Sequence, residues 1–384
     1  MVFNLVRREL IMSAQNKADY SFLGRTGLKV SNVCLGTNMF GISEVEPLAV
    51  FNSNPKRQNE VEAHKLLDRY IELGGNFLDT ADVYGAGISQ KIIGNWLKTK
   101  RRSDIIISSK VWFPMDWNTK NNIGLSRRHI INTCDETLER LQTNYIDLFQ
   151  AHIWDNATPI EDTLRTFDDL VRCGKIRYYG FSNICGWQLQ KIVDLSRHLN
   201  LHPCISLQQQ YSLLSRESEV EAFMVCENER ICVLPWSPLK GGLLTGKFKR
   251  NNIPDATGSR VGHMIARKAS GESVSSDWEK FCDDEQYWNL IALMEKFAKA
   301  KGKTVAQVAI RWLLQKDIVA SVIIGCSSIQ QLEDNMGASS GWKLSEEEMQ
   351  ELDKASRTPY SYPYNMLLGT FSTSRMNRFN SSQK

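Results

Sequence analysis

The chain has 384 residues, of which 42% are hydrophobic and 23% are charged, and its formal net charge is +4. This composition is typical of a folded globular protein rather than a disordered one, and the near balance of 47 basic and 43 acidic residues argues against a nucleic-acid-binding protein. A chain of this length could form two or three ordinary domains or one large α/β barrel.

The cysteines are nine in number and scattered, without a Cys-X-X-Cys pair. A disulfide framework normally uses an even number of cysteines, and a zinc site shows paired spacing, so we expect neither a disulfide scaffold nor a bound metal. No run of about 18 apolar residues is present, and the charged N-terminus MVFNLVRREL lacks the apolar core of a signal peptide. These features predict a cytoplasmic protein with no segment inserted in a membrane.

The first predicted elements are two short strands, 21–27 and 28–31, which turn at Thr26-Gly27 to form a hairpin. After them, a short apolar run followed by an amphipathic stretch recurs along the chain. The runs are continuously apolar and bounded by Gly, Asn or Asp, as in strands buried on both faces. Eight such strands are predicted, at 33–36, 76–80, 105–110, 146–152, 176–182, 204–208, 232–237 and 322–325.

Amphipathic helices are predicted between these strands. Ser126 is suited to cap one of them, and Gly74-Gly75 and Gly174 are suited to end two others. The predicted helices are 62–75, 89–98, 126–142, 160–175, 186–199, 218–229, 304–315 and 328–336. This alternation predicts right-handed crossovers and a closed (β/α)8 TIM barrel, whose functional sites lie at the C-terminal ends of the strands. The hairpin is then expected to cap the opposite end.

Chemically active residues follow three successive predicted strands. Asp79 and Tyr84 follow the second strand, Lys110 ends the third and His152 ends the fourth. Each alone has a structural explanation, such as a helix cap or a satisfied core group, but burying them together without a use would be costly. We interpret them as one site, in which Asp79 pairs with Lys110 and the ammonium lowers the pKa of the Tyr84 phenol, so that it can donate a proton. His152 and Tyr84 would together hold a carbonyl oxygen.

The remaining strand ends are suited to a nicotinamide dinucleotide that supplies hydride. Ser182, Asn183 and Gln208 have the donors and acceptors to hold a carboxamide, and Trp236 can stack on an aromatic ring. Both features also have plain explanations, since Ser182-Asn183 could cap a helix and Trp236 could pack in the core. Gly325-Cys326-Ser327 precedes a predicted helix whose free N–H groups can bind phosphate.

Seven segments of the sequence resemble the aldo-keto reductase superfamily and occur in the family's order. They are LGRTGLKVSNVCLGTNMFG, NFLDTADVYG, IDLFQAH, IRYYGFSN, LQQQYSLLSR, LPWSPLKGGLLTGKF and VIIGCSSIQQLEDN. The sequence looks closest to the branch that contains bacterial aldo-keto reductases and the potassium-channel beta subunits, judging by residues 236–239 and by Ser327 with Gln331.

The resemblance implies a (β/α)8 barrel and NADP(H)-dependent reduction of a carbonyl group. The residues that match the family's catalytic tetrad are Asp79, Tyr84, Lys110 and His152. The residues that resemble its cofactor contacts, besides Asp79 and Gly325, are Thr37 and Asn38 at the first strand, Ser182, Asn183 and Gln208 at the carboxamide, Trp236 at the stacking position, Ser237, Pro238, Leu239, Lys247 and Arg260 at the pyrophosphate, and Ser327, Gln331, Asp334 and Asn335 at the adenosine and its 2′-phosphate.

The chain departs from the family pattern where many reductases bind the 2′-phosphate, because no Lys or Arg occurs from Gly325 to Met336. The resemblance therefore favours NADPH without excluding NADH, and Arg260 and Lys247 are the nearest candidate cations. Asn38 stands where relatives often have Trp or another larger side chain.

Two loops and a pair of aromatic residues are expected to set the substrate. The insert 44–60 follows the first barrel strand, and the segment 249–288, which is mixed in charge and without clear periodicity, is predicted to be a lid over the pyrophosphate. Trp112 and Phe113 are expected to line the substrate pocket or, alternatively, to pack against the lid.

The predicted organisation is a flexible extension at 1–19, the barrel at 20–355 and a tail at 356–384. Two functions are compatible with the sequence: an enzyme that reduces a small carbonyl compound, or a cofactor-sensing regulatory subunit of another protein, like the potassium-channel beta subunits. The substrate and the oligomeric state are not encoded in any motif found here.

Overall fold

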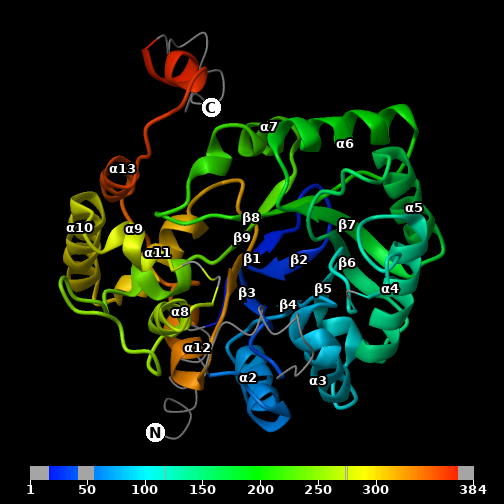
Figure 1. Ribbon diagram of the computed structural model, residues 1–384, viewed down its shortest axis with the longest axis horizontal. Coiled ribbons are helices and arrows are strands. Elements are labelled where there is room, and N and C mark those ends of the chain that lie inside the picture. The colour runs from blue at the N-terminus through cyan, green and yellow to red at the C-terminus, as the bar shows by residue number, and fades with distance from the viewer. Residues whose placement is uncertain (1–16, 42–55, 117, 273, 275, 371–384) are drawn as a thin grey trace, which may run out of the picture.

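The computed structural model describes residues 17–41, 56–116, 118–272, 274 and 276–370. At its centre is a closed barrel of parallel strands in the order β10-β3-β4-β5-β6-β7-β8-β9, which confirms the predicted (β/α)8 architecture (Figure 1). The strands are β3 (Val33–Gly36), β4 (Phe77–Asp79), β5 (Ile106–Val111), β6 (Ile146–Ala151), β7 (Ile176–Ser182), β8 (Ser206–Gln210), β9 (Cys232–Trp236) and β10 (Val322–Ile324).

Helices encircle this barrel (Figure 1). The predicted ones are α2 (Glu60–Glu72), α3 (Ile88–Leu97), α4 (Arg127–Leu141), α5 (Ile160–Arg172), α6 (Gly186–His198), α7 (Ala222–Glu229), α11 (Val305–Leu314) and α12 (Ile329–Met336). Ser126 caps α4 as expected, because its side chain accepts a hydrogen bond from the backbone N–H of His129. None of the described helices is long and apolar enough to cross a membrane.

The structure corrects the prediction for 249–288, which is not devoid of regular structure. The segment holds α8 (Arg260–Ala269), α9 (Trp278–Phe281) and the start of α10 (Glu285–Lys301). Helix α8 is amphipathic, although only Val261 and Gly262 of it are buried, so its helical pattern was present in the sequence and was missed. Helix α13 (Glu346–Ala355) was not predicted either, and it buries only Leu352.

The hairpin is confirmed as β1 (Tyr20–Phe22) paired with β2 (Lys29–Ser31). Ser21 donates a hydrogen bond to the carbonyl of Ala320, directly before β10, so the hairpin covers the N-terminal end of the barrel. The hairpin turn packs closely against the N-terminal ends of the barrel strands. A Cβ at Gly24, which has φ +58°, would lie 2.5 Å from the carbonyl oxygen of Ile205, directly before β8. Only glycine permits this approach.

The predicted terminal segments and the first insert lie mostly outside the described residues. Of 1–19, residues 17–19 are described, and of the insert 44–60, residues 56–60. The tail 356–384 is described as far as residue 370, where it forms a short π-helical turn, Asn365–Thr370 (η6), next to Tyr364, which donates a hydrogen bond to Glu221 before α7.

The barrel interior has an apolar and a polar part, because the inward-facing positions, every second residue of a strand, change from apolar to polar residues toward the C-terminal end. Near the N-terminal ends, the interior cluster contains Leu23 and Val30 of the hairpin with Phe77, Ile106 and Leu148 of the strands. Two positions further along the same strands the inward residues are polar: Asp79, Ser108 and Gln150. The hydrophobic layer between barrel and helices, by contrast, is continuous.

Candidate functional site

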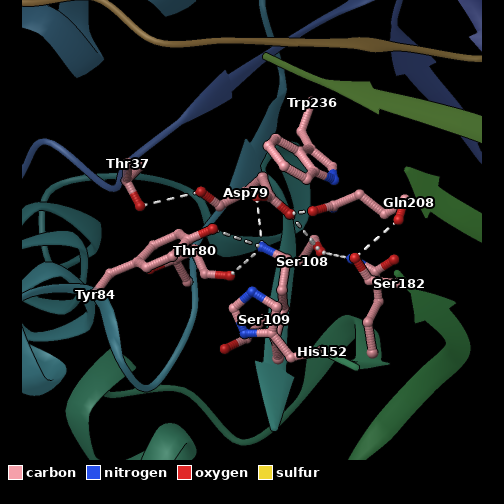
Figure 2. Close-up of polar contacts among 12 residues, drawn as sticks. Thr37, Asp79, Thr80, Tyr84, Ser108, Ser109, His152, Ser182, Gln208 and Trp236 are labelled. Atoms are coloured by element: carbon pink, nitrogen blue, oxygen red, sulfur yellow. Dashed lines mark hydrogen bonds and ion pairs between the residues drawn. The ribbon is translucent and has the colours of Figure 1, made fainter. Parts of the chain in front are cut away.

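The four residues of the predicted tetrad lie together at the C-terminal ends of β4, β5 and β6. Figure 2 shows Asp79 at the centre of the group, with Tyr84 and Thr80 on one side, Gln208 and Ser182 on the other, and His152 below. Asp79 ends β4, Lys110 is the penultimate residue of β5, and His152 follows β6 directly. The parallel register brings these ends to one edge of the barrel.

Lys110 is fully buried, and its ammonium group has three hydrogen-bond partners. Nζ lies 2.6 Å from Oδ2 of Asp79, 3.0 Å from the carbonyl oxygen of Thr80 and 3.3 Å from the hydroxyl of Tyr84. An ammonium has three N–H donors, so all of them are used. Burial opposes the charge, but Asp79 and Tyr84 favour it, and the pKa of Lys110 is raised.

The Asp79 carboxylate is held by neutral donors on its other oxygen, Oδ1. Ser108 donates its hydroxyl proton over 3.0 Å and Gln208 donates its amide over 2.9 Å. The amide of Gln150 donates in turn to the Ser108 oxygen over 2.7 Å. Thr37 donates its hydroxyl to the Asp79 carbonyl over 3.1 Å, which fixes the backbone.

Ser108 and Gln150 were not predicted as site residues, although the sequence contains a signal for them. Ser108 lies two residues before Lys110, and Gln150 two residues before His152, so each shares the inward face of its strand. Alternation within β5 and β6 would therefore have pointed to both.

Tyr84 begins a short turn, Tyr84–Gly87 (η2), in which Gly85, Ala86 and Gly87 all have positive φ. The turn carries the partly exposed phenol back toward Lys110. Our expectation of a lowered pKa for Tyr84 is wrong: burial is the largest influence and raises the pKa, and the opposing effect of Lys110 does not outweigh it.

His152 is neutral in this environment. Burial and the nearby Lys110 charge bring its pKa well below 6.5. Its ring meets the Tyr84 ring edge-on at a centroid distance of 6.1 Å and the Phe113 ring at 5.0 Å. Its Nδ1 is buried and has no hydrogen-bond partner among the described residues.

Trp112 and Phe113 form an aromatic wall beside His152. Their rings meet edge-on at 5.0 Å, and Phe113 also packs against the small cluster of Ala81 and Val83 next to Tyr84. Phe113 thus contacts His152 directly, and the lining of a substrate pocket by these two residues stays a prediction.

The predicted carboxamide residues are joined to the tetrad by hydrogen bonds. Asn183, at φ +54°, donates to the carbonyl of His152 over 2.9 Å and accepts from the indole of Trp236 over 3.1 Å. Ser182 donates to the backbone carbonyl of Gln208 over 2.8 Å. Asn38 follows β3, and its Oδ1 is buried with no described partner.

The residues predicted at the pyrophosphate lie on the loop after β9 and at the start of α8. Lys247 and Arg260 are solvent-exposed, yet the surrounding protein lowers the pKa of both side chains. No ion pair joins either cation to a described carboxylate, although the charge of Asp277 acts on Arg260. Cations without an ion-pair partner are suited to bind an anionic group.

The predicted lid packs over the loop that follows β9. This loop begins with Ser237, Pro238 and Leu239 and continues as the turn Lys240–Thr245 (η5), against which α8 packs. Lys240 forms an ion pair with Asp277, directly before α9, at 3.4 Å.

The residues predicted at the adenosine extend from Ser327, just before α12, to Asp334 and Asn335 in its last turn, and all of them contact other parts of the protein. The Gln331 side chain accepts hydrogen bonds from the Ser327 backbone and hydroxyl at 2.8 and 3.0 Å. Asp334 accepts from Thr304 over 3.2 Å, and buried Asn335 donates to the sulfur of Cys326 over 3.5 Å. Gly325 is open, since a Cβ there would meet nothing within 4 Å.

Asp82 is a further buried acid that the sequence analysis did not single out. Its Oδ1 accepts from the Val83 N–H over 2.7 Å, whereas its Oδ2 is buried with no described partner. Burial raises the pKa of Asp82 to about 7, although Arg140 and Lys110 favour the charged form and Glu136 opposes it. Within the described residues, no three His, Cys, Asp or Glu side chains gather as metal ligands would.

Comparisons with known proteins agree with this geometry. Residues 32–357 match the model of the Aldo/keto reductase family. Uncharacterized oxidoreductase YrpG of Bacillus subtilis (strain 168) is 33% identical over 83% of this chain and 90% of its own length. Versiconal hemiacetal acetate reductase of Aspergillus parasiticus is 31% identical over 88% and 96%, and an aldo-keto reductase of Fusarium vanettenii is 29% identical over 89% and 92%.

Replacing Lys110 by Met should leave the Asp79 carboxylate buried without its counter-ion. We expect the free energy of unfolding, measured by urea denaturation, to fall by about 3–5 kcal/mol. Lys98→Met, on the exposed end of α3, is the control and should change it by less than about 0.5 kcal/mol. Asp79→Asn combined with Lys110→Met should recover part of the loss, and a Lys110→Met protein as stable as the wild type would contradict this account.

The raised pKa of Asp82 predicts a pH-dependent stability. The folded protein holds a proton that the unfolded chain releases above its ordinary pKa of 3.8, so this stabilisation is complete below that pH and is lost as the pH rises to about 7. Asp82→Asn stays neutral at every pH, so its stability relative to the wild type should improve by roughly 2–3 kcal/mol between pH 5 and pH 8. Asp162→Asn, on an exposed position of α5, should show no such trend.

Proposed function

The chain belongs to the aldo/keto reductase family, and we propose that it reduces an aldehyde or a ketone to an alcohol with NADPH, with Tyr84 as the general acid. The observation that carries this proposal is the position of the Lys110 ammonium, which lies between the Asp79 carboxylate at 2.6 Å and the Tyr84 hydroxyl at 3.3 Å. The arrangement contains a proton donor and a group that stabilises its conjugate base.

Tyr84 is suited to donate a proton rather than to accept one. Its raised pKa keeps the phenol protonated at neutral pH. An alkoxide is a much stronger base than a phenolate, so the proton passes from the Tyr84 oxygen to the oxygen of the reduced carbonyl. The ammonium of Lys110 then stabilises the phenolate that remains.

His152 is suited to orient the carbonyl group. A neutral imidazole carries a single N–H, which can donate to the carbonyl oxygen without transferring a proton. This divides the work between the two residues: His152 positions the oxygen and Tyr84 protonates it. The edge-on aromatic wall of Trp112 and Phe113 would exclude water from the other side.

A nicotinamide dinucleotide, which this family uses, supplies the hydride when it is bound. The described residues fit such a group: Trp236 offers a partly exposed ring, Asn38 has a buried oxygen with no described partner, and Lys247 and Arg260 are exposed cations on the loop after β9 and at the start of α8. We propose NADPH over NADH because the resemblance to the family favours it, with Lys247 and Arg260 as the candidate cations for its phosphate groups.

The regulatory-subunit alternative is not favoured. The relatives are named as an oxidoreductase, a reductase and an aldo-keto reductase, and none is named as a channel subunit. The assignment to a particular branch, the flexible N-terminal extension and the cytoplasmic location stay predictions.

Tyr84→Phe should remove the proton donor while leaving the cleft intact. We expect kcat with a reactive aldehyde to fall by about 100- to 10,000-fold, with NADPH affinity almost unchanged, as followed by NADPH absorbance and by titration of the cofactor. Tyr362→Phe, at an exposed position of the tail, is the matched control. Turnover that survives in Tyr84→Phe would exclude Tyr84 as the acid.

Arg260→Gln and Lys247→Met should each weaken NADPH binding by about 10-fold or more, because each removes a charge-assisted contact with phosphate. If one of the two cations contacts the 2′-phosphate, its replacement weakens NADPH more than NADH, as measured by fluorescence titration. Lys249→Met, at an exposed neighbouring position that is not a predicted cofactor contact, should have little effect on NADPH affinity. A wild-type protein that binds NADH as tightly as NADPH would contradict the proposed cofactor choice.

A further inference from the structure

A second cavity, of about 490 Å³, lies at the N-terminal end of the barrel. Its lining includes Arg25 and Thr26 of the hairpin turn, Arg177 and Tyr178 at the start of β7, His202 before β8 and Arg230 before β9. The tetrad occupies the opposite ends of the strands, so this cavity is separate from the site described above. Its volume is in the range of small-molecule sites.

The lining of this cavity is cationic and contains no acidic residue. Among the described residues, none of Arg25, Arg177 and Arg230 forms an ion pair with a carboxylate. Asp147, whose carboxylate senses the charge of Arg177, is ion-paired with Arg102 at 2.7 Å. Three guanidinium groups thus line one concavity without an ion-paired carboxylate among the described residues.

The fold fixes the backbone next to Arg25 and at Arg230, and it fixes the guanidinium group of Arg177. The close approach of Gly24 to Ile205 fixes the turn that carries Arg25 over the strand entrances. Arg177 lies 4.2 Å above the ring of Tyr145 and donates to the carbonyl of Gly174 over 3.1 Å. Arg230 is held at φ +56° as the C-terminal cap of α7.

His202 is fixed at the rim by an acid outside the lining. Its Nδ1 lies 2.6 Å from Oδ1 of Asp168, which also accepts from the His202 backbone N–H over 2.8 Å. Asp168 is further paired with Arg172, so its charge is already shared by two partners. It therefore compensates none of the three arginines.

We propose that this cavity binds a small polyanion, a compound that carries a phosphate group or several carboxylates. Guanidinium groups present paired N–H donors that match the oxygens of phosphate and carboxylate, and several of them around one concavity can contact one ligand at once. A macromolecular partner fits less well, because the cations converge on a cavity instead of extending over a face. The proposal is independent of the reaction assigned to the tetrad.

The test measures binding of inorganic pyrophosphate and of citrate to the full chain by isothermal titration calorimetry at low ionic strength with saturating NADPH. The triple variant Arg25→Gln, Arg177→Gln, Arg230→Gln should bind at least one probe about 10-fold or more weakly than the wild type. Glutamine suits position 230, since Gln142 already adopts φ +53° in this chain.

A matched triple variant removes the same charge elsewhere. Arg128→Gln, Arg165→Gln and Arg357→Gln lie at exposed positions outside the cavity and should leave the affinity within about twofold of the wild type. Any binding of a probe near the tetrad is the same in both triple variants. The difference between their affinities therefore measures binding in this cavity, even if the proposed carbonyl reduction is disproved.

Two results would overturn the proposal: equal affinities of the two triple variants, or a wild-type protein that binds neither probe. Thermal melting of each variant shows whether it is folded. If the cavity variant does not fold, the single variants replace it, and each should lose affinity by about threefold or more; unchanged affinity in all three would also overturn the proposal.

Discussion

The buried ion pair between Lys110 and Asp79 is the interaction on which the rest of the structure depends. Removing two charges from water is favourable only if their remaining donors and acceptors are satisfied, and here every N–H of the ammonium and both carboxylate oxygens are engaged. The partners come from β5, from β8 and from the loop after β4, so the pair requires a closed barrel in one register. The residues proposed for catalysis are therefore also constrained by folding.

Because this pair lies inside the barrel, the interior has a polar level and an apolar level at different heights along the barrel axis. Side chains at alternate positions point inward, so Phe77 and Asp79 occupy successive interior levels, as do Ile106 and Ser108. The apolar level lies under the hairpin, and the polar level lies at the opposite ends of the strands, where the loops can cover it. The apolar level excludes water at the hairpin end of the barrel, and the polar level is accessible from the C-terminal ends of the strands.

The sequence predicted the strands and the proximity of Asp79, Tyr84, Lys110 and His152, because each strand is a short apolar run followed by a polar residue. Prediction from the sequence failed where the property depends on how a side chain is buried in the folded barrel. The pKa of Tyr84 was expected to fall because Lys110 is visible in the sequence, but the burial that raises it is a property of the assembled barrel. Ser108 and Gln150 were hidden within runs interpreted as apolar. Helix α13 was not predicted, and it buries only Leu352; α8 is amphipathic, but its pattern was overlooked within a segment of mixed charge.

The overall charge of +4 conceals two local concentrations of positive charge at opposite ends of the barrel. Lys247 lies on the loop after β9 and Arg260 begins α8, whereas Arg25, Arg177 and Arg230 surround the cavity at the N-terminal ends of the strands. At physiological ionic strength, charges are screened over about 8 Å, so each group acts on its own surroundings and not on the other. A near-neutral chain can therefore hold separate anion sites, provided that the fold keeps acidic side chains out of each concavity. The barrel achieves this by pairing its nearby acids elsewhere: Asp147 with Arg102, Asp168 with Arg172 and Glu229 with Arg197.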